Sequence, residues 1–172
     1  MRVGARVPVE RCHRTGEAWT WLTFGDEKLA KRIASFRLTS LRARGAFLPA
    51  IEFLERDARG ELATAKILGV PWIPRPRARS TVGRVGGLLV RTTGRDTARL
   101  LAHASDRDDE AIILAHERRE RGGGRAHYVI AIRGWSFAGD VRTKGEQLER
   151  GWTALDAEHL YPIERLTMAA GA

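Results

Sequence analysis

The sequence has little cysteine and no long hydrophobic run, and both absences narrow the kinds of protein it can encode. Cys12 is the only cysteine. A single thiol excludes an intrachain disulfide and a zinc site built on paired thiolates, and it suits a reducing compartment. No apolar stretch reaches the length of a signal-peptide core or a membrane span. We therefore expect a cytoplasmic protein that does not contact a membrane.

The motifs of several large enzyme classes are also missing. There is no Walker loop, no Gly-x-Ser-x-Gly elbow and no dinucleotide fingerprint, so nucleotide hydrolases, serine hydrolases and Rossmann enzymes find no support. The five histidines are scattered without a short-spaced pair. The acidic cluster from Asp106 to Glu110 lacks the twelve-residue loop of a calcium hand, and we expect a solvated turn there. The sequence therefore predicts no resident metal or cofactor.

What the chain does carry is positive charge. Its 172 residues hold 30 Lys plus Arg against 21 Asp plus Glu, for a net charge of +9 and a pI near 10.9. Most of these cations are arginines, whose guanidinium fork matches phosphate oxygens. A GC-rich genome would also enrich arginine, whatever the function. DNA or another nucleic acid is the partner that this charge favours, while a homo-oligomer or a phage or host protein partner stays open.

Two helices are predicted in the first half of the chain. The first runs from Asp26 to Arg44, with Leu29, Ile33 and Phe36 on its inward face. The second runs from Pro49 to Leu68 and ends at Gly69. Cations gather on the outward face of the first helix, where they either meet solvent or contact phosphates: Lys28, Lys31, Arg32 and Arg42.

Strands dominate the second half. The run Leu88–Thr93 follows a glycine turn and predicts a buried strand, which we expect to be the central one. Apolar runs at 111–115 and 128–135 predict two more, and the glycines at 122–124 predict a hairpin loop between them. The weaker pattern at 19–24 is a strand or an ordered lead-in. We expect one α/β domain over 17–166, with a mixed central sheet flanked by helices, after a loose segment 1–16 and before a tail 167–172.

A second basic stretch precedes and includes the predicted central strand. It reads either as a phosphate-binding loop and strand or as a mobile basic loop. The cations of this stretch that we expect to contact nucleic acid are Arg75, Arg77, Arg79, Arg84, Arg91 and Arg95.

The order of these segments resembles a phage and mobile-element group of the restriction-endonuclease-like PD-(D/E)XK nuclease superfamily. The basic helix, the segment 60–72 and the segment 83–92 carry the resemblance. It continues through 106–114, the Gly134–Trp135 step and the closing segment 160–166, so it spans about positions 19 to 166. The resemblance implies a mixed sheet with helices on its faces and a site at one edge of the central hairpin.

The resemblance also implies a catalytic pattern from which this chain departs. In active members a helix glutamate, an aspartate and a Glu-x-Lys or Gln-x-Lys pair hold Mg²⁺ and the attacking water. Glu61 matches the glutamate, but Arg84 stands at the aspartate position, Leu89 at the Glu or Gln position and Arg91 at the lysine position. Glu61 and Arg91 are thus the remnants of a degenerate catalytic site. Arg84 either contacts phosphate or forms a salt bridge with Glu61.

Three functions follow as alternatives. The first is a nucleic-acid-binding protein, phage or mobile-element associated, with an inactive nuclease-like site. The second is a Mg²⁺-dependent DNA endonuclease or exonuclease, which needs a replacement carboxylate such as Asp57 or Glu55 beside Glu61. The third is a structural or protein-interaction subunit that binds no nucleic acid.

Overall fold

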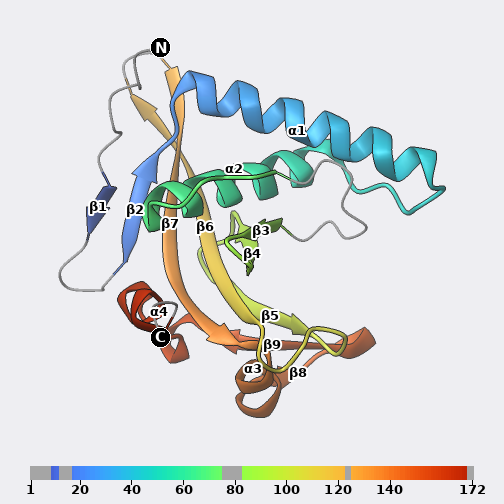
Figure 1. Ribbon diagram of the computed structural model, residues 1–172, viewed down its shortest axis with the longest axis vertical. Helices are drawn as coiled ribbons and strands as arrows, with labels where there is room; N and C mark the ends of the chain where they lie inside the picture. The colour runs from blue at the N-terminus through green and yellow to red at the C-terminus, as the bar shows by residue number, and fades with distance from the viewer. Residues whose placement is uncertain (1–8, 12–16, 75–82, 123–124, 170–172) are drawn as a thin grey trace.

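The fold is a mixed six-stranded sheet with two long helices on one face and a small second sheet on the other (Figure 1). The computed structural model describes residues 9–11, 17–74, 83–122 and 125–169. The large sheet has the order β1-β2-β7-β6-β4-β3, and its β4 and β6 pair in parallel while all other neighbours are antiparallel. Its strands are β1 (Val9–Arg11), β2 (Ala18–Trp21), β3 (Gly83–Val85), β4 (Leu88–Thr93), β6 (Ala111–Gly122) and β7 (Arg125–Phe137).

The second sheet has three antiparallel strands in the order β5-β9-β8. The strands are β5 (Arg99–His103), β8 (Glu146–Gln147) and β9 (Trp152–Asp156). The helices are α1 (Phe24–Ala43), α2 (Ile51–Leu68), α3 (Ala138–Lys144) and α4 (Ile163–Ala169), with short 3-10 turns η1 (Glu149–Gly151) and η2 (Ala157–His159).

Helix α1 begins at a capping box and buries a different face from the one predicted. The Thr23 side chain accepts a hydrogen bond from the Asp26 backbone N–H, and the Asp26 carboxylate accepts one from the Thr23 backbone N–H at 2.7 Å. These two bonds satisfy backbone N–H groups that have no partner within the helix. Ile33 is buried as expected, but Leu29 and Phe36 are exposed. The buried residues are Ala30, Ile33, Ala34, Arg37 and Leu41.

The inward face of α1 is built largely on alanines, which let α1 lie close to α2. Ala30 packs with Ala58, and Ala34 packs with Leu54. Alanines let two helices lie close together, so the large side chains of Leu29 and Phe36 fall outside the contact.

Helix α2 lies between α1 and the sheet (Figure 1). It begins at Ile51, so the prediction that Pro49 opens it is wrong, and it ends as predicted at Gly69, whose φ of 68° is left-handed. At Gly60 the helix nearly touches β4, because a Cβ on this residue would overlap the Thr92 side chain. This close approach fixes α2 over the carboxyl end of β4.

The large sheet buries both of its faces. Val90 and Ile113 pack under α2 with Leu62, while the adjacent Leu89 and Ile112 face the other way. Because side chains alternate along a strand, neighbouring positions belong to different cores. The second core contains residues of the small sheet and of α3: Leu100, Ala102, Leu155, Ala138 and Val141.

The strand Leu88–Thr93 is confirmed, but its predicted place at the centre of the sheet is wrong. β4 lies next to the edge strand β3, and β6 and β7 occupy the middle. The reason is that β2, which lies more than a hundred positions before β7 in the chain, pairs with β7. No local sequence pattern predicts this pairing. The hairpin loop predicted at 122–124 falls largely on residues 123–124, outside the described residues.

Regular structure continues beyond both predicted limits of the domain, residues 17 and 166. β1 lies before residue 16 and pairs with β2, and α4 continues past residue 166 to Ala169. Among the described residues, no helix combines the length and the apolar character needed to cross a membrane.

Candidate functional site

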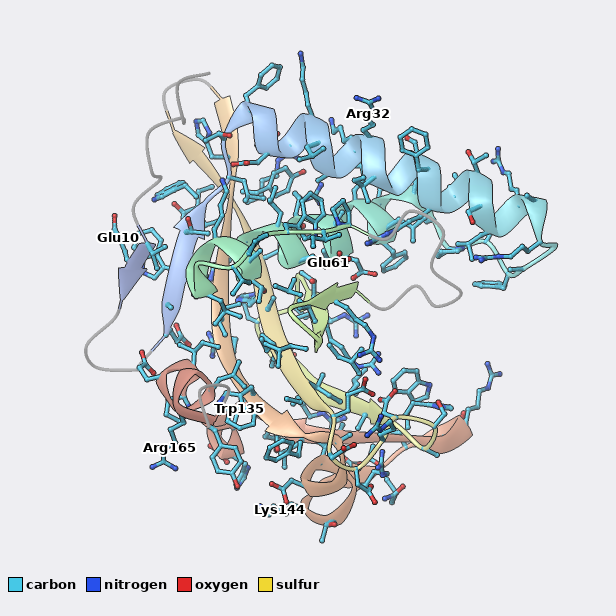
Figure 2. The ribbon with its side chains drawn as sticks, in the orientation of Figure 1. Glu10, Arg32, Glu61, Trp135, Lys144 and Arg165 are labelled. Atoms are coloured by element: carbon cyan, nitrogen blue, oxygen red, sulfur yellow. The ribbon has the colours of Figure 1, made fainter. Side chains whose placement is uncertain are left out.

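Glu61 lies buried between α2, α1 and the β3–β4 hairpin (Figure 2). Its two carboxylate oxygens accept from the two terminal nitrogens of Arg37 at 2.5 and 2.8 Å, and one also accepts from the Trp72 indole N–H at 3.2 Å. Only 1% of Glu61 and 6% of Arg37 is exposed. Because the Arg37 guanidinium binds both oxygens of the Glu61 carboxylate, this carboxylate is not open to a ligand.

The predicted salt bridge between Glu61 and Arg84 is wrong. Arg84 pairs with Glu110 and donates to the Gly87 carbonyl at 3.2 Å. A Cβ at Gly83 would overlap the Glu61 carboxylate, so Gly83 faces α2. Successive residues of a strand point to opposite faces, and Arg84 therefore points away from Glu61.

Of the two replacement carboxylates, Asp57 lies near Glu61 and Glu55 does not join them. The pKa of Asp57 is raised to about 7, mainly by burial and then by the charge of Glu61, while Arg37, Arg56 and Arg91 act to lower it. Glu55 instead faces Arg59 at 3.4 Å. Asp57 and Glu61 are one helical turn apart on α2, and Arg37, which pairs with Glu61, also acts on Asp57.

These carboxylates do not fit a Mg²⁺ site. Mg²⁺ prefers ionised oxygen ligands in near-octahedral geometry. Glu61 is engaged by Arg37, and Asp57 keeps its proton to about pH 7. Within the described ranges, no three His, Cys, Asp or Glu side chains gather closely enough to hold a metal ion.

A groove of about 1000 Å³ opens at the carboxyl end of β4, which we call the arginine groove. One wall is the first half of α2, and the other comes from the segment after β4, from β5 and from the segment after β8. Its lining residues are Phe53, Arg56, Arg91, Thr92, Thr93, Gly94, Arg95, Thr97, Ala98, Arg99, Leu101, Leu114, Leu148 and Asp156. Four guanidinium groups thus face a single lining carboxylate.

Three of the four groove arginines are held in place by partners outside the groove. Arg91 contacts Asp106 at 2.8 Å, and its guanidinium lies 4.9 Å from the centre of the Trp152 ring. Arg56 lies 3.4 Å from Glu117, and Arg99 pairs with Glu146. Arg95 is exposed, and within the described residues its side chain has no ion pair. The groove therefore combines three ordered cations with one that reaches into solvent.

The predicted binding residues divide between several places. Arg91 and Arg95 line the groove, whereas Arg84 lies on β3 with Glu110. Lys28, Lys31, Arg32 and Arg42 are exposed on α1, and Arg32 points away from the rest of the molecule (Figure 2). The predictions for Arg75, Arg77 and Arg79 lie outside the described residues.

Two groove arginines were not among the predicted site residues. Arg56 sits on α2 and Arg99 on β5, and only the tertiary structure brings them to one cavity. Arg99 ends the basic stretch that begins at Arg75 in the sequence, but it was not chosen as a binding residue. No local signal separates Arg56 from an ordinary helical surface residue.

The acidic segment is a turn whose residues 107–109 are exposed, as expected, and its carboxylates also serve as counter-charges. Asp106 contacts Arg91, Glu110 contacts Arg84, and Asp108 contacts Arg142. Asp109 pairs with its exposed neighbour Arg107 at 2.7 Å. The turn thus holds two predicted phosphate contacts, Arg84 and Arg91, in defined positions.

Trp135 belongs to the core. Trp135 is buried, packs with Ile163 and Leu166 of α4, and donates its indole N–H to the Pro162 carbonyl at 3.1 Å. It is closed to a nucleic-acid base.

Comparison with protein-family models, with curated proteins and with solved structures finds no match for this chain.

Proposed function

We propose that this protein binds nucleic acid through the arginine groove and that its nuclease-like site does not hydrolyse the bound strand. The observation that carries the proposal is the convergence of Arg56, Arg91, Arg95 and Arg99 on one cavity with a single lining carboxylate. These residues come from α2, β4, the segment after β4, and β5. Guanidinium groups fork onto phosphate oxygens, and a groove lined by several of them attracts a polyanion.

The absence of hydrolysis rests on the chemistry around Glu61. A nuclease of the superfamily that the sequence resembles needs ionised oxygen ligands for Mg²⁺ at this helix and hairpin. Here Arg37 occupies the carboxylate of Glu61, and the side chains that would complete the site are Arg84, Leu89 and Arg91. The scaffold keeps a basic surface, and its described residues lack the donors for the metal.

Fluorescence anisotropy with a labelled oligonucleotide tests binding. We expect affinity to fall steeply with added salt, because each phosphate contact releases counterions. Arg95→Gln should weaken binding several-fold and reduce the slope of log K against log salt by about 0.7 to 0.9. Arg165→Gln is the matched control, since this exposed arginine lies on α4 and points away from the groove (Figure 2). An affinity that does not respond to salt would refute the proposal.

A second assay tests the lack of hydrolysis. Pure protein is incubated with plasmid DNA, Mg²⁺ and Mn²⁺, and the plasmid should stay intact. Metal-dependent nicking that disappears in a Glu61→Ala variant still folded by circular dichroism would establish the endonuclease instead. A stable oligomer that ignores both oligonucleotides and heparin would establish the structural subunit.

A further inference from the structure

The arginine groove contains apolar side chains that phosphate binding does not explain. Phe53, Leu101, Leu114 and Leu148 line it together with the arginines. Two of them remain open to solvent, with 57% of Phe53 and 36% of Leu148 exposed. They come from opposite walls, since Phe53 lies on the first turn of α2 and Leu148 lies between β8 and η1. Large apolar side chains left exposed on two walls of a basic cavity indicate a ligand with an apolar part as well as charge.

A double helix does not offer such a part to a narrow groove. Its bases are paired and stacked inside, and its outer surface presents phosphates and sugars. An unpaired nucleotide presents a phosphate and a free base face together, and single-strand binding sites combine a basic groove with aromatic side chains for this reason.

Phe53 is arranged as a platform for such a base. The guanidinium of Arg56 lies 5.6 Å from the centre of the Phe53 ring, and its Nε lies 3.4 Å from the Glu117 carboxylate. Gly94 packs next to this guanidinium, because a Cβ there would stand 3.5 Å from it. An aromatic ring with an ordered guanidinium next to it can stack one base and neutralise the adjoining phosphate.

We infer that the arginine groove takes single-stranded nucleic acid, with an unpaired base between Phe53 and Leu148 and the adjoining phosphates on Arg95 and Arg99. This inference rests on the proposed function and narrows it to one class of ligand. Arg56, Arg91 and Arg99, which other side chains already position, offer the strand cations in fixed places. The apolar floor formed by Leu101 and Leu114 excludes water below the base.

The test compares one labelled oligonucleotide, single-stranded and as a blunt duplex, on the full chain and two variants. Phe53→Ala removes the platform. Phe36→Ala is its matched control, because Phe36 is 50% exposed on α1 and lies 5.8 Å from the guanidinium of Arg32. We expect the single strand to bind more tightly than the duplex. Phe53→Ala should weaken single-strand binding by about ten-fold or more and leave duplex binding unchanged.

Each other outcome is also decisive. Equal binding of both forms with no effect of Phe53→Ala overturns this inference and leaves the proposed function standing. A loss in Phe36→Ala instead of Phe53→Ala overturns it too, because the strand would then lie on α1. No binding of either form overturns the proposed function itself. Unchanged circular dichroism and melting temperature of both variants show that any loss is a loss of contact rather than of folding.

Discussion

Replacing Glu61 with glutamine should destabilise the whole fold, because it leaves the Arg37 guanidinium buried without a counter-charge. Glutamine keeps the shape of the side chain and a carbonyl oxygen for the Trp72 N–H, so the change isolates the charge. Both members of the pair are almost fully buried and share two hydrogen bonds. Removing one partner of such a pair costs about 3 to 5 kcal/mol. That loss is a large share of the roughly 5 to 15 kcal/mol that holds a typical domain folded.

The loss can be measured by urea denaturation followed by tryptophan fluorescence and by thermal melting. For a domain of this size about 2 to 4 °C is lost per kcal/mol, so the melting temperature of Glu61→Gln should fall by roughly 6 to 20 °C. The double variant Arg37→Leu with Glu61→Leu should recover much of this loss, since it buries no lone charge. Glu158→Gln is a control at an exposed glutamate and should stay within about 0.5 kcal/mol of the parent.

The result that would refute this reasoning is a Glu61→Gln variant as stable as the parent. Glu61 would then not depend on Arg37, and the carboxylate would be free for another role. A catalytic glutamate predicts that opposite pattern, in which activity is lost and stability is kept.

Three further predictions concern stability. Because the folded state holds the proton of Asp57 to about pH 7 and the unfolded state releases it near 3.8, stability should fall as pH rises through that window. Between pH 5 and pH 8 the parent should lose about 3 kcal/mol relative to Asp57→Asn in urea titrations, and an equal difference between the two proteins at both pH values would contradict this. Gly60→Ala should lose about 1 to 3 kcal/mol through overlap with Thr92 despite alanine's better helix propensity, whereas Gly25→Ala, with its nearest neighbour at 3.7 Å, should keep its melting temperature. Thr23→Ala should cost about 1 kcal/mol in thermal melts by removing the α1 cap, and an unchanged melting temperature would show that the cap carries no stability.

Local patterns predicted the elements better than the surfaces they bury. The strand Leu88–Thr93 and the end of α2 at Gly69 were readable because alternation, glycine and helix length are local properties. The buried face of α1 was not readable, because it includes Arg37. An arginine is acceptable there only because Glu61 meets it from another helix, and that meeting is a fact of tertiary structure.

The candidate site shows the same limit. A basic composition and the arginines Arg91 and Arg95 pointed to one part of the groove. The opposite wall, with Arg56 and Phe53, comes from a helix whose sequence gives no sign that its first turns face a cavity. The pairing of Arg84 with Glu110 could not be foreseen either, because the choice between two carboxylates depends on which face of β3 the side chain leaves.

The pairing of β5 with β9 has a consequence for the synthesis of this protein. Leu100 on β5 lies opposite Leu155 on β9, so β5 leaves the ribosome long before its partner exists. Until β9 arrives, an apolar strand with open hydrogen-bonding edges is available to other nascent chains. The pairing of β5 with β9 also closes a long loop, and contacts between residues far apart in the chain form slowly. Yield in the cell should therefore depend on how fast translation proceeds from β5 to β9, and on chaperones that cover β5 in the meantime.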